Sequence, residues 1–252
     1  IVLFGTEEQK NKYLPGLASG KKIGAFGLTE PNAGSDAGNT QTRAVFDGEH
    51  YVINGEKSFC TNAGVSSVLI FTAVIIEKDQ EKGISAFVID SNTPGISFNP
   101  PEKKMGWCAS DTRSIFFKDV CIPQSAVLGN PEKGFNQFLQ TLTSGRITIA
   151  ALSIGTAQGA FDRALAYSNE REAFGKAINQ FQGISFKLSD MVTQIEASRH
   201  LTYHAAWIKD QGSPVIQEAA MAKLFASETA MKVTTEAIQI FGGYGYIKEY
   251  DV

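Results

Sequence analysis

The spacing of apolar residues changes once along this 252-residue chain, near residue 125, and that change constrains the fold most. From Ile23 to about Ser125, short β-branched and aromatic runs alternate with turn residues, a pattern typical of antiparallel strands. After Pro123, apolar residues recur at helical intervals instead. The sequence therefore predicts a β-rich segment followed by a helical segment.

In the β-rich segment, strands are expected where such runs are bounded by Gly, Pro or charged residues. The runs cover residues 44–46, 51–53, 57–60, 68–75, 84–89 and 113–117. Asp47-Gly48 and Asn54-Gly55 each favour a hairpin turn, because their backbones tolerate positive φ. Six or so strands in about one hundred residues predict a small β-barrel or sandwich.

Helices are expected before and after this segment. Thr6 and Gln9 have capping-box spacing, which predicts a helix over residues 7–19. Three long helices are then predicted over 130–171, over 184–210, and from Ser213-Pro214 onward. Short loops between them favour an antiparallel bundle. The expected fold class is thus α+β and multidomain, with an antiparallel β-barrel or sandwich followed by a helical bundle.

Composition excludes several classes of protein. A net charge of −3 gives no electrostatic footprint for a polyanion, so nucleic acid is not an expected partner. Cys60, Cys108 and Cys121 are far apart, which favours a reducing compartment over a disulfide framework. The longest apolar run, residues 66–76, falls short of the ~20 residues of a membrane-spanning helix. We also find no signal peptide, and expect both termini of the chain to be incomplete.

A possible metal site also has to be weighed. Glu196, His200 and His204 share one face of a predicted helix, but no HExxH motif is present, so we expect a solvated stripe and no metal.

Two segments of the β-rich part have the composition of a binding site. Residues 26–38 are rich in Gly, Ser, Thr and Asn at a predicted strand end, which suits a polar ring edge or a phosphate. An ordinary surface loop has the same composition. Residues 57–64 offer one aromatic side chain, Phe59, beside hydroxyl and amide groups, the mixture that a flavin ring needs. Phe59 taken alone is equally consistent with a core residue.

Two further segments lie in the helical part. Arg171 ends the first long helix, where a guanidinium can clamp a pyrophosphate or simply be solvated. Gly242 and Gly243 follow the last predicted helix, where they can form a C-cap or allow a ligand to approach the backbone closely.

These four segments, in this order, resemble the acyl-CoA dehydrogenase family across essentially the whole chain. The resemblance implies that residues 1–22 are the tail of an N-terminal helical domain, 23–125 a middle β-domain, and 126–252 most of a C-terminal helical bundle. It also implies FAD as the cofactor and a homo-oligomer, commonly a tetramer, in which neighbouring subunits complete each flavin site.

The resemblance assigns roles to particular residues. Residues implied to bind FAD are Phe26, Leu28, Thr29, Gly34, Ser35, Phe59, Thr61, Arg171, Phe174, Gln182, Gln239, Gly242 and Gly243. Ser35 and Arg146 are implied to contact the acyl-CoA substrate. No residue of the chain can be named as the catalytic base. Gly145 stands where one branch of the family has a Glu, so the base is expected beyond Val252, as in the short-chain branch, and the chain alone is expected to be inactive.

The implied reaction is α,β-dehydrogenation of a short-chain acyl-CoA to the trans-2-enoyl-CoA, with electrons passed to an electron-transfer flavoprotein. The compartment would be the cytoplasm of a bacterium or the mitochondrial matrix of a eukaryote. Departures from the family pattern, such as Thr143 for a common Asp and Phe59 for a common Trp, indicate a divergent substrate preference. The alternatives are an acyl-CoA oxidase-type flavoprotein on the same scaffold and a non-catalytic binding or assembly module.

Overall fold

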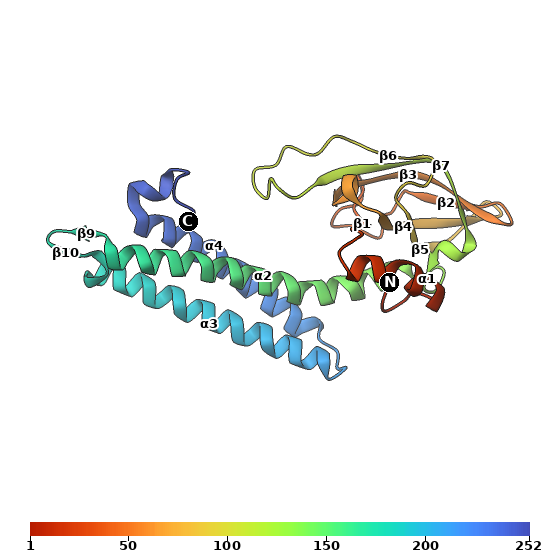
Figure 1. Ribbon diagram of the computed structural model, residues 1–252. Coiled ribbons are helices and arrows are strands. Elements are labelled where there is room, and N and C mark those ends of the chain that lie inside the picture. Colours follow the sequence, from red (N-terminus) through yellow and green to blue (C-terminus); the bar gives the residue numbers. More distant parts are fainter. The chain divides into compact units, whose positions relative to one another are not determined.

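The computed structural model describes residues 1–252, which form two compact units. The β-rich unit covers Ile1–Leu139 and the helical unit covers Gln140–Val252 (Figure 1). The domain limits expected from the sequence stay a prediction.

The β-rich unit is built on one eight-stranded sheet. Its strands are β1 (Gly24–Gly27), β2 (Arg43–Phe46), β3 (His50–Thr61), β4 (Val68–Glu77), β5 (Gln80–Asp90), β6 (Ile96–Phe98), β7 (Thr112–Pro123) and β8 (Val127–Leu128). They are ordered β6-β7-β3-β2-β4-β5-β8, and β1 pairs with β4 beside this path. Most ladders are antiparallel, as expected, while β1 and β2 both run parallel to β4.

Large side chains fill the core of this unit. Phe71 is fully buried and its ring lies 4.5 Å from Phe117 and 5.5 Å from Phe87, measured between ring centroids. Such aromatic pairs stabilise a core beyond the area that they bury. All six predicted runs lie in strands, but 51–53 and 57–60 belong to the single strand β3, and none of the six runs covers β1, β6 or β8.

The turn predicted at Asn54-Gly55 is wrong. Strand β3 runs straight through it, and its pairing with β7 shifts register between Ile53 and Gly55, which is a β-bulge. Gly55 has φ +144°, and a Cβ there would lie 2.7 Å from the backbone of Thr42. The dipeptide was read correctly as a place for unusual backbone angles, but it serves a bulge. The hairpin at Asp47-Gly48 does form, between β2 and β3.

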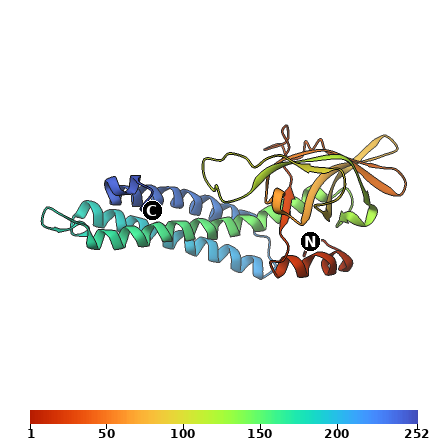
Figure 2. The same cartoon turned by 45° about the horizontal axis from the view of Figure 1, so that its top comes forward.

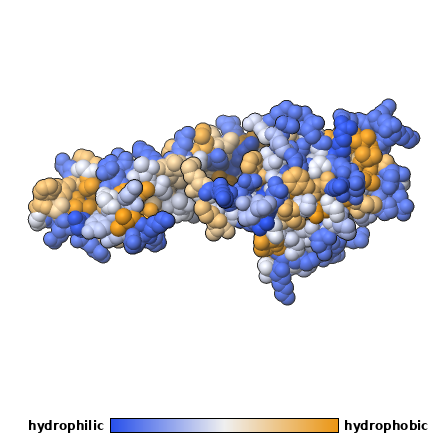
Figure 3. All heavy atoms as spheres, turned by 90° about the horizontal axis from the view of Figure 1, so that it is seen from above, coloured by the Kyte–Doolittle hydropathy of each residue, from blue (hydrophilic) through white to orange (hydrophobic).

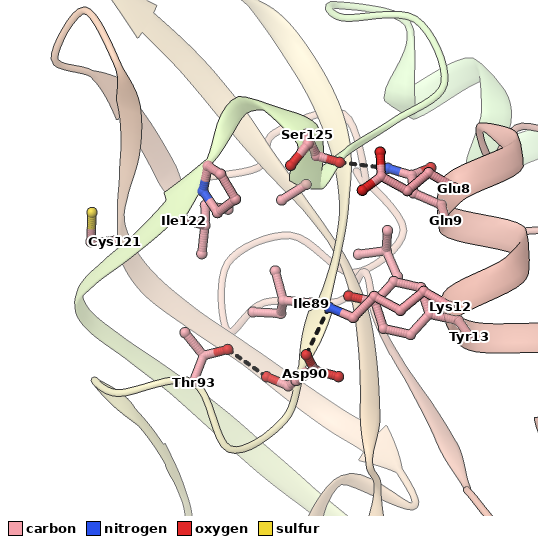
Figure 4. A pocket seen from close by; sticks show the side chains of 13 residues that line it. Glu8, Gln9, Lys12, Tyr13, Ile89, Asp90, Thr93, Cys121, Ile122 and Ser125 are labelled. Atoms are coloured by element: carbon pink, nitrogen blue, oxygen red, sulfur yellow. Dashed lines mark hydrogen bonds and ion pairs between the residues drawn. The ribbon is translucent and has the colours of Figure 1, made fainter. Parts of the chain in front are cut away.

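Helix α1 (Glu7–Ala18) forms where the sequence predicts it, with the Thr6–Gln9 capping box present. Gln9 turns toward the sheet and its Nε2 donates to the carbonyl oxygens of Ser125 and Val127, at 2.8 and 2.9 Å. Figure 4 shows the small hollow that remains beneath this helix, of about 180 Å³. None of the residues predicted to bind a ligand lines it.

The helical unit consists of long helices (Figure 2), and its core mixes alanines with larger apolar side chains. Its elements are α2 (Gly134–Glu170, which begins in the other unit), the short strands β9 (Glu172–Ala173) and β10 (Lys176–Ala177), α3 (Gln182–Asp210) and α4 (Ile216–Phe241). Fully buried alanines, including Ala150, Ala219 and Ala222, lie where the helices approach one another. Helix α2 begins at Gly134 and α4 at Ile216, each a few residues after its expected cap.

Four short 3-10 segments complete the chain: Ala63–Val65, Gln124–Ala126, Ile178–Gln180 and Gly242–Tyr246. No helix is both long and apolar enough to cross a membrane. The predicted fold class, a β-rich part followed by a helical part, is confirmed.

Candidate functional site

The most unusual backbone of the β-rich unit lies at Phe59. This residue has φ +55° and its side chain is 68% exposed, although it stands within strand β3. The register with β7 shifts between Lys57 and Cys60, so a bulge turns Phe59 away from the core. A bulky residue at positive φ is costly, and such strain concentrates at functional sites. The structure thus decides between the two readings of Phe59: it is an exposed aromatic surface.

Two threonines and a turn lie close to Phe59 along the backbone. Thr61 is exposed two residues further along β3, and Asn62 follows at φ +64°. The Ser58 N–H donates to the Thr29 carbonyl oxygen at 2.8 Å, which places the Thr29 backbone beside β3. An exposed aromatic residue with threonines nearby has the composition that suits a ring with a polar edge.

The segment 26–35 enters this region from the end of β1. Phe26 is half-buried and stacks on Phe138 with ring centroids 4.5 Å apart, so its ring contributes to packing. Leu28 is partly exposed just beyond the strand, and Gly34 and Ser35 lie exposed in the loop that follows. The structure thus brings Leu28 and Thr29 next to Phe59, and leaves Ser35 on the adjoining loop.

A buried ion pair lies directly beneath this segment. Lys57 is fully buried and its Nζ lies 2.6 Å from Glu30 Oε1, which is also buried. Burial alone would raise the pKa of Glu30, but the charge of Lys57 and the hydrogen bonds to the carboxylate together lower that pKa below its ordinary value. Burial lowers the pKa of Lys57, against the opposing attraction of Glu30. The Lys57 ammonium and these hydrogen bonds thus stabilise the ionised form of the Glu30 carboxyl.

The neighbouring thiol is not a reactive group. Cys60 is buried, and that burial raises its pKa to about 11. A thiol in this state is protonated at neutral pH and is a poor nucleophile. Cys60 is therefore a packing residue.

Asp111 fixes the chain just after Thr61. Its carboxylate accepts hydrogen bonds from the Gly64 N–H at 2.8 Å and from Arg113 Nε at 2.7 Å, and its carbonyl oxygen accepts one from the Asn62 N–H. A side chain at Gly64 would displace the Arg113 guanidinium from its present place. Asp111 therefore holds the turn that ends the candidate surface.

In the helical unit, a second group of predicted residues shares one open hollow. Arg171 lies immediately after α2, exposed, with its guanidinium carbon 5.7 Å from the centre of the Tyr244 ring. Arg171, Gly242 and Gly243 all line a hollow of about 370 Å³, with Tyr167 and Phe241 stacked at its side. Residues far apart in the sequence are thus brought together at this end of the helices.

The glycines take both roles that the sequence left open. Gly242 caps α4 with φ +60° and ψ −132°, a conformation that disfavours any other residue. The same glycine and Gly243 expose backbone to the hollow. Gln239, one turn earlier on α4, is exposed and is not among the residues that line the hollow.

Phe174 stands at the tip of the β9–β10 hairpin. It has φ +51°, is followed by Gly175 at φ +78°, and is 96% exposed. Phe181, on the chain just before α3, meets it edge-on with 6.1 Å between ring centroids, and Gln182 begins α3 with its side chain exposed. An aromatic side chain so exposed on a tight turn is available to a partner or a ligand.

Arg146 does not join this group. It lies on α2, half-buried, with Nη1 3.5 Å from Thr143 Oγ1. At ~1.5 Å per residue, the helix from Arg146 to its end at Glu170 spans ~36 Å. Arg146 therefore belongs to a different part of any ligand site than Arg171.

Comparison with known proteins agrees with this geometry. Residues 25–120 match the model of the acyl-CoA dehydrogenase middle domain, and residues 132–252 match that of the C-terminal domain. A probable acyl-CoA dehydrogenase of Bacillus subtilis is 53% identical over 100% of this chain and 67% of its own length. This chain belongs to the acyl-CoA dehydrogenase family.

Within the acyl-CoA dehydrogenases, several of the similar proteins act on short acyl chains. The short-chain specific enzyme of Clostridium acetobutylicum is 50% identical over 98% of this chain and 65% of its own length. The structure of butyryl-CoA dehydrogenase from Megasphaera elsdenii superposes with a TM-score of 0.94 at 49% identity, covering 98% of this chain and 65% of that one. The chain thus spans about two thirds of the length of the curated relatives that it matches. The resemblance stated from the sequence is confirmed.

Sequence reasoning missed the residues that hold this acyl-CoA dehydrogenase surface in place. Glu30 and Lys57 lay inside the two quoted segments, but neither was given a role. The available signal was a lysine at the inward-facing position of a strand, where a charge needs a partner. The position of Asp111 gave no such signal, because its partners Gly64 and Arg113 depend on the pairing of β3 with β7.

Proposed function

We propose that this chain forms the flavin-binding and acyl-CoA-binding part of an enzyme that dehydrogenates short-chain acyl-CoA thioesters to trans-2-enoyl-CoA. The observation that carries the proposal is Phe59, an exposed aromatic residue held at positive φ next to Thr29 and Thr61. The short-chain specific relatives support the substrate class.

FAD fits the two groups of residues. In the β-rich unit, Phe59 offers a face to the flavin ring, while Thr29 and Thr61 offer hydroxyls to its polar edge. In the helical unit, the Arg171 guanidinium and the backbone at Gly242 suit a pyrophosphate. A solved structure titled as PigA with FAD and proline, 37% identical to this chain with a TM-score of 0.92, supports the assignment.

The chain contributes binding and orientation to the proposed reaction. When bound, FAD would supply the acceptor for the hydride that leaves the substrate β-carbon. Ser35, on the exposed loop, and Arg146, on α2, are the residues proposed to hold the acyl-CoA. By fixing the substrate, they would align the reacting carbon with the flavin-facing surface.

Glu30 is not the base that removes the α-proton. Its carboxylate is buried, paired with Lys57 and already accepts the N–H groups of Gln41 and Thr42. A group so fully engaged cannot take a proton from substrate. The base that removes the α-proton is therefore a carboxylate other than Glu30.

The site is proposed to be completed by a second copy of the chain. The helical unit carries many exposed apolar side chains, and they reach its surface (Figure 3). Leu224, Met231 and Ile238 recur at seven-residue spacing on α4, and each is exposed. Exposed apolar stripes of this kind support a homo-oligomer, with a tetramer as the proposed form.

The proposed electron acceptor is an electron-transfer flavoprotein. A solved structure titled for the electron transferring flavoprotein of Acidaminococcus fermentans has a chain 49% identical to this one, with a TM-score of 0.95. The reaction would take place in the cytoplasm of a bacterium or in the mitochondrial matrix.

A second candidate is the reverse reaction, reduction of an enoyl-CoA. It is favoured by relatives named acryloyl-CoA reductase (NADH) and caffeyl-CoA reductase-Etf complex subunit, each 45% identical to this chain. The oxidase alternative has a more distant neighbour, the prolyl acyl carrier protein oxidase AnaB, at 33% identity.

The test uses the intact protein that contains this chain, loaded with FAD and held under nitrogen. Bleaching of the visible flavin band by butyryl-CoA supports the dehydrogenase. A band that stays unchanged with butyryl-CoA, but returns in the chemically reduced protein when trans-2-butenoyl-CoA is added, supports the reductase. In a separate assay in air, oxygen consumption with butyryl-CoA supports the oxidase. Failure to bind FAD overturns all three.

A further inference from the structure

In the ion pair between Glu30 and Lys57, the ammonium uses all three of its donors. The Lys57 ammonium has three N–H donors, which reach Glu30 Oε1 at 2.6 Å, Thr72 Oγ1 at 3.0 Å and the Leu28 carbonyl oxygen at 3.2 Å. Buried charges are tolerated only when they are paired and hydrogen-bonded in this complete way.

The carboxylate of the pair closes a loop. Glu30 Oε2 accepts the Gln41 N–H at 2.6 Å, and Oε1 accepts the Thr42 N–H at 3.1 Å. The two ends of the segment 30–42 therefore meet at one side chain. Ser35 lies within this segment, so its position depends on the closure.

The ammonium of the pair orients the peptide that leads into Thr29. In a planar trans peptide, C=O and N–H point in opposite directions. Lys57 holds the Leu28 carbonyl toward the core, so the Thr29 N–H points away from Lys57. The Thr29 carbonyl oxygen in turn accepts a hydrogen bond from the N–H of Ser58, the residue before Phe59. One ammonium thus fixes both strands that border the exposed aromatic surface.

Stability alone gives little reason for such a pair. Replacing a buried ion pair with apolar residues of similar volume is often neutral or stabilising. The Lys57 methylene chain packs at Gly27 beside the Cys60 sulfur, and only its ammonium lies among polar groups. The pair is better explained by the backbone geometry that its hydrogen bonds impose.

We propose that the Glu30–Lys57 pair is a positioning device, which sets the Leu28–Thr29 peptide, the loop bearing Ser35 and the Phe59 bulge in the one arrangement that receives the flavin ring. The proposal rests on the proposed function for the identity of the ligand. It makes Glu30 and Lys57 positioning residues, because neither reaches the surface on which the flavin would lie.

The test compares variants of the intact protein. The single variant Lys57→Met leaves a buried carboxylate without its partner and can fail to fold. The main variant is therefore the double substitution Glu30→Gln/Lys57→Met, which removes both charges and keeps the volumes. A matched control, Arg43→Met/Glu81→Gln, removes an exposed ion pair on the same sheet. A second control, Ile122→Ala, destabilises the same core through a buried residue outside the segment.

The first readout needs no flavin. Hydrogen exchange of the peptides covering residues 28–42 should speed up by about 10-fold or more in the double variant, and stay unchanged in both controls. Unchanged exchange in the double variant would overturn the proposal, whatever happens to flavin binding.

The second readout is the flavin itself. In the double variant we expect weaker FAD binding, a shifted visible flavin spectrum, and a kcat lower by about 100-fold with KM for butyryl-CoA changed far less. The Ile122→Ala control, compared at a fall in melting temperature equal to that of the double variant, should keep the wild-type flavin spectrum and kcat. A double variant with wild-type spectrum and kcat sinks the proposal. If the wild-type protein takes up no FAD while hydrogen exchange still speeds up in the double variant, the proposed function fails. The pair then only holds the 30–42 loop in place.

Discussion

In the β-rich unit a buried ion pair holds the candidate site residues through hydrogen bonds. In the helical unit the candidate site residues lie beside stacked aromatic rings and two glycines. Phe59 is anchored through Ser58 to Thr29, and through it to Lys57, which is fully buried. Arg171 and Phe174, by contrast, have exposed side chains that contact aromatic rings. The first half of the site is thus organised within its own unit.

The two cores share one property and differ in another. Both bury polar groups, which are the charged pair Glu30–Lys57 in the β-rich unit and the hydroxyl pair Ser198–Thr229 in the helical unit. Only the β-rich unit fully buries a charged pair, and that pair lies next to its candidate site residues.

Truncating the β-rich core should have the largest effect on stability. We expect Phe71→Ala to lower the free energy of unfolding by about 3–5 kcal/mol, because it removes a buried ring that packs against two others. Chemical denaturation measures this. Phe59→Ala is the matched control, since its ring is mostly exposed and its loss should change stability by less than about 0.5 kcal/mol. Equal losses in the two variants would contradict the assignment of Phe59 to the surface.

Enlarging a residue of the helical core should have an intermediate effect. Ala222→Leu places extra atoms where α4 is fully buried, and overpacking of this kind costs about 1–3 kcal/mol. Ala220→Leu, two residues earlier on the exposed face of α4, should be close to neutral. Thermal unfolding of both variants checks the comparison. A neutral Ala222→Leu would show that this core is loosely packed.

Acid should weaken the β-rich unit through Glu30. Its pKa is lower in the folded protein than its ordinary value of 4.5, so its contribution to stability is complete above that value. The contribution is lost as the pH falls through the lowered folded pKa, where the carboxylate takes up a proton. Glu30→Gln should therefore flatten the pH dependence of the unfolding free energy below 4.5. A variant with the same acid profile as the wild type would exclude Glu30 as the source.

Removing the guanidinium from the helical unit should have the smallest effect on stability. Arg171→Ala should change the unfolding free energy by less than about 0.5 kcal/mol, because the side chain is exposed. FAD affinity should nevertheless fall by about 10-fold to 100-fold, as expected when a charged hydrogen bond to phosphate is lost. Isothermal titration with FAD measures it. Exposed Lys209, at the other end of α3, offers the control substitution Lys209→Ala.

Local signals in the sequence predicted local structure well. The Thr6–Gln9 capping box and the hairpin at Asp47-Gly48 depend on a few neighbouring residues, and both form as predicted. The segments that could bind a ligand were also found, because glycines and hydroxyl residues cluster there. At Asn54-Gly55 the same local signal was misread, since only the pairing of β3 with β7 decides between a turn and a bulge.

Long-range contacts explain what the sequence could not predict. Lys57 and Glu30 are 27 positions apart, and their pairing follows from the sheet that brings β1 and β3 together. The exposure of Phe59 likewise depends on a shift of register between two strands. The residues proposed to bind the ligand could be named from motifs, but the groups that hold them in place required the fold.

The central claim is that the two halves of the site, Phe59 with its neighbours and Arg171 with its neighbours, bind one FAD from different copies of the chain. Mixing tests it most directly. Phe59→Ala and Arg171→Ala proteins, each impaired alone, are combined under conditions that allow subunit exchange, and bound FAD is measured. If the halves meet across a two-fold interface, roughly a quarter of the sites regain wild-type affinity. If no high-affinity sites appear although subunits have exchanged, the halves do not meet across subunits, and the account is contradicted.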